Sequence, residues 1–158
     1  MRESVGGTWL FGLVITFMLL FVAYLTVMIN YSTAFKNKNE VVSIIEKYEG
    51  LSSGDTNSIG IINNYLKNSG YNATGKCDEE WYGATSLDSS ANLIEKADNA
   101  YYCVKYNSTG KQIGYFDVKL FLKFDLPVFG QIGRFKINGQ TIKIHNAQCK
   151  GLGNKKGC

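Results

Sequence analysis

Residues 8–29 read TWLFGLVITFMLLFVAYLTVMI, and the rest of the predicted architecture depends on this run. It holds 22 residues without a single charge. At about 1.5 Å per helical residue it reaches about 33 Å, which is enough to cross a hydrocarbon core of about 30 Å. Because lipid offers the backbone no hydrogen-bond partners, a spanning segment must satisfy its own groups, and we expect an α-helix here.

The polar sequence that follows continues the helical pattern without a breaker. From Asn30 to Glu49 apolar residues recur at helical spacing, and Gly50 is a C-terminal stop signal. We therefore predict an N-terminal transmembrane and assembly helix over residues 1–50, followed by a head domain over residues 51–158. The apolar stripe expected to pack on the head consists of Val41, Ile44, Ile45 and Tyr48.

The head is expected to be α+β, with short helices first and an antiparallel, β-rich end. The pattern predicts helices from Ile59 to about Asn68 and over residues 89–98. Residues 116–126 alternate apolar and polar side chains, which is typical of a strand with one buried face, and this pattern leaves Phe121 on the polar face. Asn138-Gly139, between two β-rich runs, predicts a hairpin turn.

Four cysteines follow the apolar stretch, and their even number in a small domain indicates two disulfides in an oxidising compartment. Three pairings satisfy the count. We favour Cys77–Cys103 with Cys149–Cys158, because the second pair closes a short Gly/Lys loop at the chain end. Reduced thiols are the alternative and would require a cytosolic head. No C-x-x-C spacing occurs, so zinc is not predicted.

The cysteines also set the predicted topology, which is a single-pass protein of the cytoplasmic membrane with an extracytoplasmic head. Counting basic residues on the two sides of the span does not favour an inside N-terminus. The competing interpretation is a cleaved secretory signal. The apolar run is longer than a usual signal core and lacks both a basic start and an A-x-A site.

Small residues recur every four positions within the apolar stretch, at Thr8, Gly12 and Thr16. This spacing lets a second helix approach closely, so we assign these residues to assembly. Ala23, Thr26 and Asn30 continue a similar stripe. The alternative is that each threonine only bonds its own backbone.

The last part of the chain is basic. Asp125 is the last acidic residue. An acidic polymer or anionic headgroups are candidate partners for this end, and an ordinary solvated surface is the simpler explanation. Nucleic acid is not expected, because no reader motif is present. The basic residues after Asp125 are Arg134, Lys136, Lys143, Lys150, Lys155 and Lys156.

No pattern in the chain indicates catalysis. His145 is the only histidine and has no evident partner, and nucleophile, metalloprotease and phosphate-loop motifs are missing from the sequence. The acidic run CDEEWYG, residues 77–83, lacks calcium-ligand spacing. We therefore predict that the protein is not an enzyme and has no cofactor and no metal.

With these features together, the chain resembles type IV pilin-like proteins, most closely the Tad-type minor pilins and pseudopilins of bacteria. The resemblance lies in Glu3 before the apolar stretch, the long helix over residues 9–50, the β-rich end and the cysteines at 149 and 158. It implies helices that bundle in a filament core or wait in the membrane. It also implies a glutamate near the helix start that pairs with a neighbour's terminal amine, the role that would fall to Glu3. Gly6 and Gly7 follow Glu3, whereas the processing glycine of such proteins precedes the glutamate.

The resemblance implies a structural subunit of a type IV-like (Tad-type) surface filament or secretion apparatus. Its partners would be copies of itself or other pilin-like subunits, bound through the N-terminal helix. The alternative is a single-pass, membrane-anchored binding or adhesion module that does not polymerise, with the basic C-terminal region as its contact surface.

Overall fold

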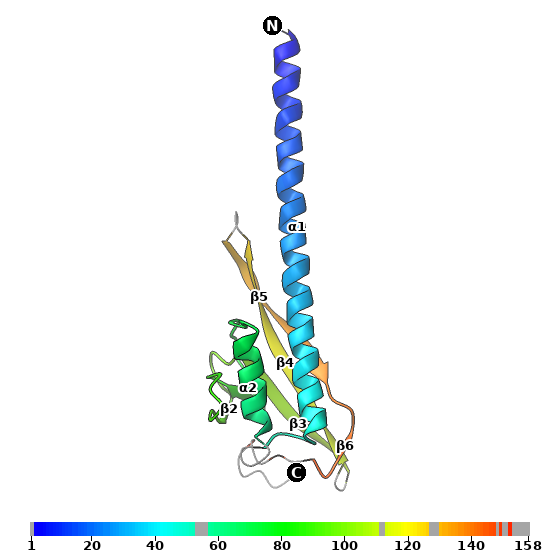
Figure 1. The fold of residues 1–158 in the computed structure, drawn as a ribbon, viewed down its shortest axis with the longest axis vertical. Helices are drawn as coiled ribbons and strands as arrows, with labels where there is room; N and C mark the ends of the chain where they lie inside the picture. The colour runs from blue at the N-terminus through cyan, green and yellow to red at the C-terminus, as the bar shows by residue number, and fades with distance from the viewer. Residues whose placement is uncertain are drawn as a thin grey trace.

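The computed structural model describes residues 2–52, 57–110, 113–126, 130–147, 149 and 152, with the backbone alone at 2–6, 124–126 and 130–133. Figure 1 shows one long helix whose N-terminal half projects from a head built of a second helix and a sheet. The predicted α+β class is confirmed. The helices are α1 (Arg2–Lys47) and α2 (Ser58–Asn68), and the strands are β1 (Tyr82–Ala84), β2 (Leu93–Glu95), β3 (Tyr102–Gly110), β4 (Ile113–Leu126), β5 (Gly130–Gln140) and β6 (Ile144–His145).

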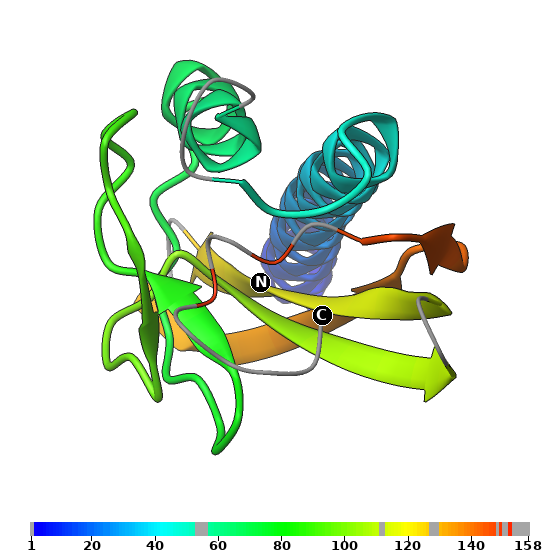
Figure 2. The same cartoon turned by 90° about the horizontal axis from the view of Figure 1, so that it is seen from below.

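The strands form one antiparallel sheet in the order β2-β1-β3-β4-β5, with β6 pairing the start of β4. Seen along the long helix, α1 and α2 lie side by side on one face of the sheet (Figure 2). β4 is the longest strand and carries most of the contact with α1. β3 begins at Tyr102, opposite Leu120, so the part of the β4–β5 hairpin beyond that point is two-stranded.

The main core lies between the two helices and the sheet. The predicted stripe of α1 is confirmed, because Val41, Ile44 and Ile45 are buried. The predicted helix at 59–68 is confirmed as α2, whose N-cap Asn57 accepts a hydrogen bond from the Gly60 N–H at 2.9 Å. The sheet supplies the alternate residues of β3 and β4, as a period of two requires. The fully buried side chains of this core include Ile59, Ile62, Leu66, Tyr102, Val104, Phe116, Val118 and Leu120.

The predicted stop at Gly50 is also confirmed. The Gly50 N–H donates to the Ile45 carbonyl at 2.8 Å, and the left-handed residue that turns the chain is Glu49, with φ 52°. This pair of features closes the helix by satisfying carbonyls of its last turn. The chain thereby turns back from α1 toward α2.

The predicted hairpin turn at Asn138-Gly139 is wrong. Both residues lie inside β5, where they pair with Lys119 and Val118 of β4. The glycine serves close packing instead, because a Cβ at Gly139 would lie 2.7 Å from the Lys38 Cδ on α1. The sheet needs a glycine there to let α1 approach, and this requirement overrides the local turn preference.

Two further expectations about the head are corrected. Residues 89–98 are not a helix but turns around the short strand β2. Phe121, expected on the exposed face of its strand, is 2% exposed. It packs in a second, smaller cluster on the face of the sheet away from the helices. The buried members of this cluster are Ala73, Cys77, Ala97, Ala100, Cys103 and Phe121.

Tyr71 joins the loop after α2 to the sheet just above the start of β3. Its hydroxyl oxygen lies 2.6 Å from the Phe121 carbonyl and accepts the Phe121 N–H at 2.8 Å. The same oxygen lies 3.1 Å from the Tyr101 carbonyl. Burial raises the pKa of Tyr71, while the hydrogen bond with the Phe121 backbone lowers it. The Tyr71 hydroxyl therefore bonds both the N–H and the carbonyl of Phe121, at a place where β3 no longer pairs with β4.

We expect Tyr71→Phe to lower the free energy of unfolding by about 1–3 kcal/mol, because the Phe121 N–H loses its partner in a buried place. Urea unfolding of the oxidised chain measures the loss. The raised pKa of Tyr71 supplies a second readout. Stability from its protonated form is present below about pH 10 and is lost as the pH rises further. The variant should therefore lose less stability than the parent above pH 10, and an equal loss in both would contradict this role.

Candidate assembly surface on the N-terminal helix

The N-terminal half of α1 has the length and composition of a membrane span. Among the described residues, one helix meets these criteria, over Gly7–Lys47, and its apolar window is not buried by the head. Large apolar side chains such as Trp9 and Phe17 are exposed there. An unburied apolar surface of this extent needs lipid or protein to cover it.

Thr8, Gly12 and Thr16 lie together on this exposed segment. The Thr16 Oγ1 donates to the Gly12 carbonyl at 2.9 Å, so its hydroxyl is satisfied within the helix. Thr26 and Thr33 do the same to Val22 and Ile29. The alternative role of the threonines is thus present at Thr16, and it is compatible with packing because it hides the polar group from a partner helix.

A shallow groove opens over Gly12. A Cβ placed on Gly12 would meet no heavy atom within 4 Å, so the isolated chain leaves this position open. Within the described part of the subunit, no neighbouring atom therefore requires a glycine at position 12. The groove is lined by Thr8, Trp9, Gly12, Leu13, Thr16, Phe17 and Leu20.

The face of α1 that carries Thr8, Gly12 and Thr16, called the small face from here on, points to the same side of the helix as the head. Eighteen residues make about five full turns of an α-helix, so Gly12 and Asn30 share one side. Asn30 is half-buried, and Ala34 and Asn37 further along that side are buried by the head. Ala23 and Thr26 are also partly covered, as their place in the predicted stripe implies. Large apolar residues, such as Trp9, Leu13 and Phe17, flank this side of the span.

The remaining predicted site residues are placed as follows. The predicted disulfide Cys77–Cys103 is confirmed. Cys149 is not a free thiol, and Cys158 lies outside the described residues. Glu3 belongs to α1, but its side chain lies outside the described residues, so its pairing stays a prediction.

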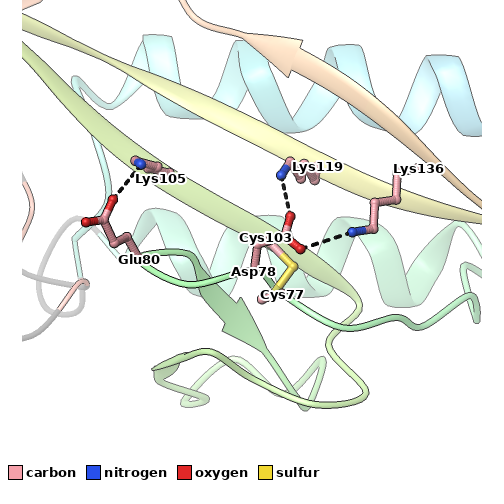
Figure 3. A network of polar contacts seen from close by, with 7 residues as sticks. All are labelled: Cys77, Asp78, Glu80, Cys103, Lys105, Lys119 and Lys136. Carbon is pink, nitrogen blue, oxygen red and sulfur yellow. Dashed lines mark hydrogen bonds and ion pairs between the residues drawn. A yellow bond between two sulfur atoms is a disulfide. The ribbon is translucent and has the colours of Figure 1, made fainter.

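An ion-pair network that sequence reasoning missed lies beside the disulfide on the outer face of the sheet (Figure 3). Asp78 accepts hydrogen bonds from the Lys119 Nζ at 2.7 Å and the Lys136 Nζ at 3.3 Å. These bonds, first from Lys119 and then from Lys136, hold the pKa of Asp78 below its usual range. Lys119 also stacks over the Trp81 ring, 3.6 Å from its centre. The acidic run at residues 77–83 is thus held by strand lysines.

Three of the six basic residues after Asp125 lie in the described part of the chain. Arg134 and Lys136 lie on β5, while Lys143 precedes β6, and Lys150, Lys155 and Lys156 lie outside the described residues. Arg134 and Lys136 help to line an open cavity of about 600 Å³ next to the disulfide. Its charged lining residues are Lys76, Asp78, Glu79, Lys96, Arg134 and Lys136.

Within the described part of the chain, no three His, Cys, Asp or Glu side chains gather as a metal site would require. His145 ends β6 and is exposed. The candidate functional features described above are two surfaces, the small face of α1 and the charged outer face of the sheet.

In comparisons with known proteins, the chain matches no family model, no curated protein and no solved structure. Its architecture is pilin-like: a long, apolar N-terminal helix packs on the antiparallel sheet of a head that contains a disulfide.

Proposed function

We propose that this protein is a structural subunit, a pilin or minor pilin, of a bacterial type IV-like filament or secretion apparatus of the Tad type. The observation that carries the proposal is the unburied apolar half of α1, with its open face at Gly12, joined without interruption to a folded head. Lipid covers that half in the membrane. In a filament, the same half of neighbouring subunits covers it.

The physical requirement for such assembly is small. Helices leaving lipid gain no hydrophobic energy from one another, so close packing must favour the filament. A glycine flanked by threonines one turn away on either side permits that packing. The remaining parts of the subunit need only be a stable, displayed head, and the role is structural and not catalytic.

The disulfide supports an extracytoplasmic head. Cys77 and Cys103 are both buried and bonded to one another. Disulfides form and persist in oxidising compartments and are rare in the cytosol. The N-terminus of α1 is then on the cytoplasmic side, and the head lies outside.

Negative-stain microscopy of sheared cell-surface material, with mass spectrometry of the subunit's N-terminus, tests the proposal. We expect filaments that react with an antibody against the head, and an N-terminus that reports whether cleavage occurs near Gly6 and Gly7. A protein that stays wholly in the membrane fraction, with no copy in filaments or in a purified secretion complex, would overturn it.

The second candidate is a membrane-anchored module that binds an anionic wall polymer. The observation in its favour is the cavity on the outer face, where cations outnumber carboxylates. Under this hypothesis, charge reversal at Lys76 and Lys96 should abolish polymer capture and leave the membrane anchor unchanged. Under the first proposal, filament yield would stay the same.

A further inference from the structure

Two exposed aromatic residues mark where the membrane surface would cross α1. Trp9 is 75% exposed and Tyr31 is 52% exposed. They are 22 residues apart, which corresponds to about 33 Å along a helix. Trp and Tyr gather at both membrane–water interfaces, and the hydrocarbon core is about 30 Å thick. The surface of the membrane on the side of the head is therefore expected near Tyr31.

The sheet reaches this level. A cavity of about 130 Å³ is lined by Asn30 and Thr33 of α1 and by Leu122 and Lys123 of β4, which places Lys123 beside the end of the apolar span. Figure 1 shows the β4–β5 hairpin running along α1 toward its N-terminus, beyond the rest of the head. The hairpin thus comes as close to the membrane as any described part of the head.

The partial burial of α1 agrees with this position. From Lys123 to Leu126, β4 advances by about 10 Å at 3.3 Å per residue, which equals six or seven helical residues. In the same interval of α1, Ala23, Thr26 and Val27 are partly covered, whereas the residues before them are exposed. The strand ends therefore lie on the membrane side of Tyr31.

Cations gather on the hairpin at this level. Lys123 of β4 and Arg134 of β5 are directly opposite one another in the register, so they share one face of the sheet. Arg134 is exposed and Lys123 is half-buried. Lys136, one pair further from the membrane, forms an ion pair with Asp78. In the sequence, residues 124–133 carry one charge, Asp125.

We propose that Lys123 and Arg134 bind the headgroups of anionic phospholipids in the outer leaflet, which makes the β4–β5 hairpin a second membrane contact of the head. The inference rests on the membrane-anchored state of the proposed function. Long basic side chains suit this place, because their stems lie along apolar surface while their charges reach the phosphates. Lipid of net negative charge attracts each such cation in addition to the anchoring by α1.

The contact would fix the head in the membrane-resident state. Lys123 and Arg134 lie on the sheet, away from the α1 axis, so binding at this pair draws this side of the head toward the membrane and restrains the tilt of the head. In a filament the pair leaves the lipid and becomes available to a neighbour.

Lipid titration of the full chain in non-ionic detergent, followed by native mass spectrometry, tests the inference. The probes are phosphatidylglycerol and phosphatidylcholine. At about fivefold per cation, we expect Lys123→Gln with Arg134→Gln to weaken phosphatidylglycerol binding by about 30-fold. Phosphatidylcholine binding should stay unchanged.

The matched control is Lys47→Gln with Lys143→Gln. Both residues are exposed and lie at the opposite end of the head, near the last turn of α1 and the start of β6. This variant removes the same charge and should bind phosphatidylglycerol like the parent. Thermal unfolding of both variants checks that the head remains folded.

Several outcomes would overturn the inference. One is a parent chain with no preference for phosphatidylglycerol, and another is an equal loss in the control. A third is a result in which the double variant loses binding of a soluble anionic polysaccharide but keeps its preference for phosphatidylglycerol. That result would assign Lys123 and Arg134 to a polymer. If alkaline carbonate releases the chain from membranes, the anchored state itself fails. If the chain resists carbonate but shows no lipid preference, only the inference fails.

Discussion

Gly12→Leu is expected to reduce filament yield at least tenfold while leaving the head as stable as in the parent chain. The isolated subunit has open space where the new side chain begins, because no heavy atom lies within 4 Å of a Cβ at Gly12. A neighbouring helix that packs against this face meets the leucine and is held away. Close approach at a small residue provides the attraction between helices in lipid, so the loss falls on assembly alone.

Val14→Leu supplies the control. Val14 is also exposed. Two residues rotate the helix by about 200°, so Val14 points away from the face that holds Gly12. Quantitative immunoblots of sheared filaments, normalised to the membrane-bound subunit, measure both variants. Equal losses at the two positions, or normal yield from Gly12→Leu, would rule out the small face as the packing surface.

The second large effect is expected from removing the disulfide. Replacing Cys77 and Cys103 with alanine should lower the free energy of unfolding by about 3 kcal/mol, the cost that chain entropy assigns to a loop of this size. The bond spans 26 residues. The enclosed segment has little regular structure of its own, with β1 and β2 of three residues each. Besides the disulfide, it is held by the pairing of β1 with β3 and by the ion pairs of Asp78 with Lys119 and Lys136.

Urea unfolding measures the total loss, and hydrogen exchange locates it. We expect backbone amides of residues 71–101 to exchange faster in the double alanine variant, while those of α2 and the centre of β4 keep most of their protection. Alanine is the proper replacement, because serine would bury a hydroxyl in an apolar cluster. Unchanged stability, or uniform loss of protection throughout the head, would contradict a local role of the bond.

The parts of the fold that sequence predicts well are those with strong local signals. The apolar span and the stripe at Val41 and Ile44 follow the helical period, and the centre of β4 follows the strand period. Residues 71–100 have no such period. Their order comes from distant partners, such as the Tyr71 hydroxyl on Phe121. Local patterns contain no information about such contacts.

The errors have the same origin. Alternation indicates one buried face and so places Phe121 on the polar face of its strand. The second cluster that buries Phe121 is built from residues far away in the chain. Gly139 fits a turn by its local sequence, and only the packing of Lys38 against the strand shows its use. Lys123 and Arg134 are visible in the sequence, but their adjacency depends on the register of β4 with β5.

α1 is one uninterrupted helix, so it behaves as a rigid element. Its 46 residues span about 69 Å, with the centre of the apolar stretch about 33 Å from the buried anchor at Val41. Sharp bends in helices arise at defined disruptions such as proline, and the sole proline of the chain is Pro127. For a rigid helix, a change of 10° in the inclination of the span would therefore move the segment around Val41 sideways by about 6 Å. A small change in the inclination of the apolar half of α1 is in this way translated into a displacement of several ångströms at the other end of the helix.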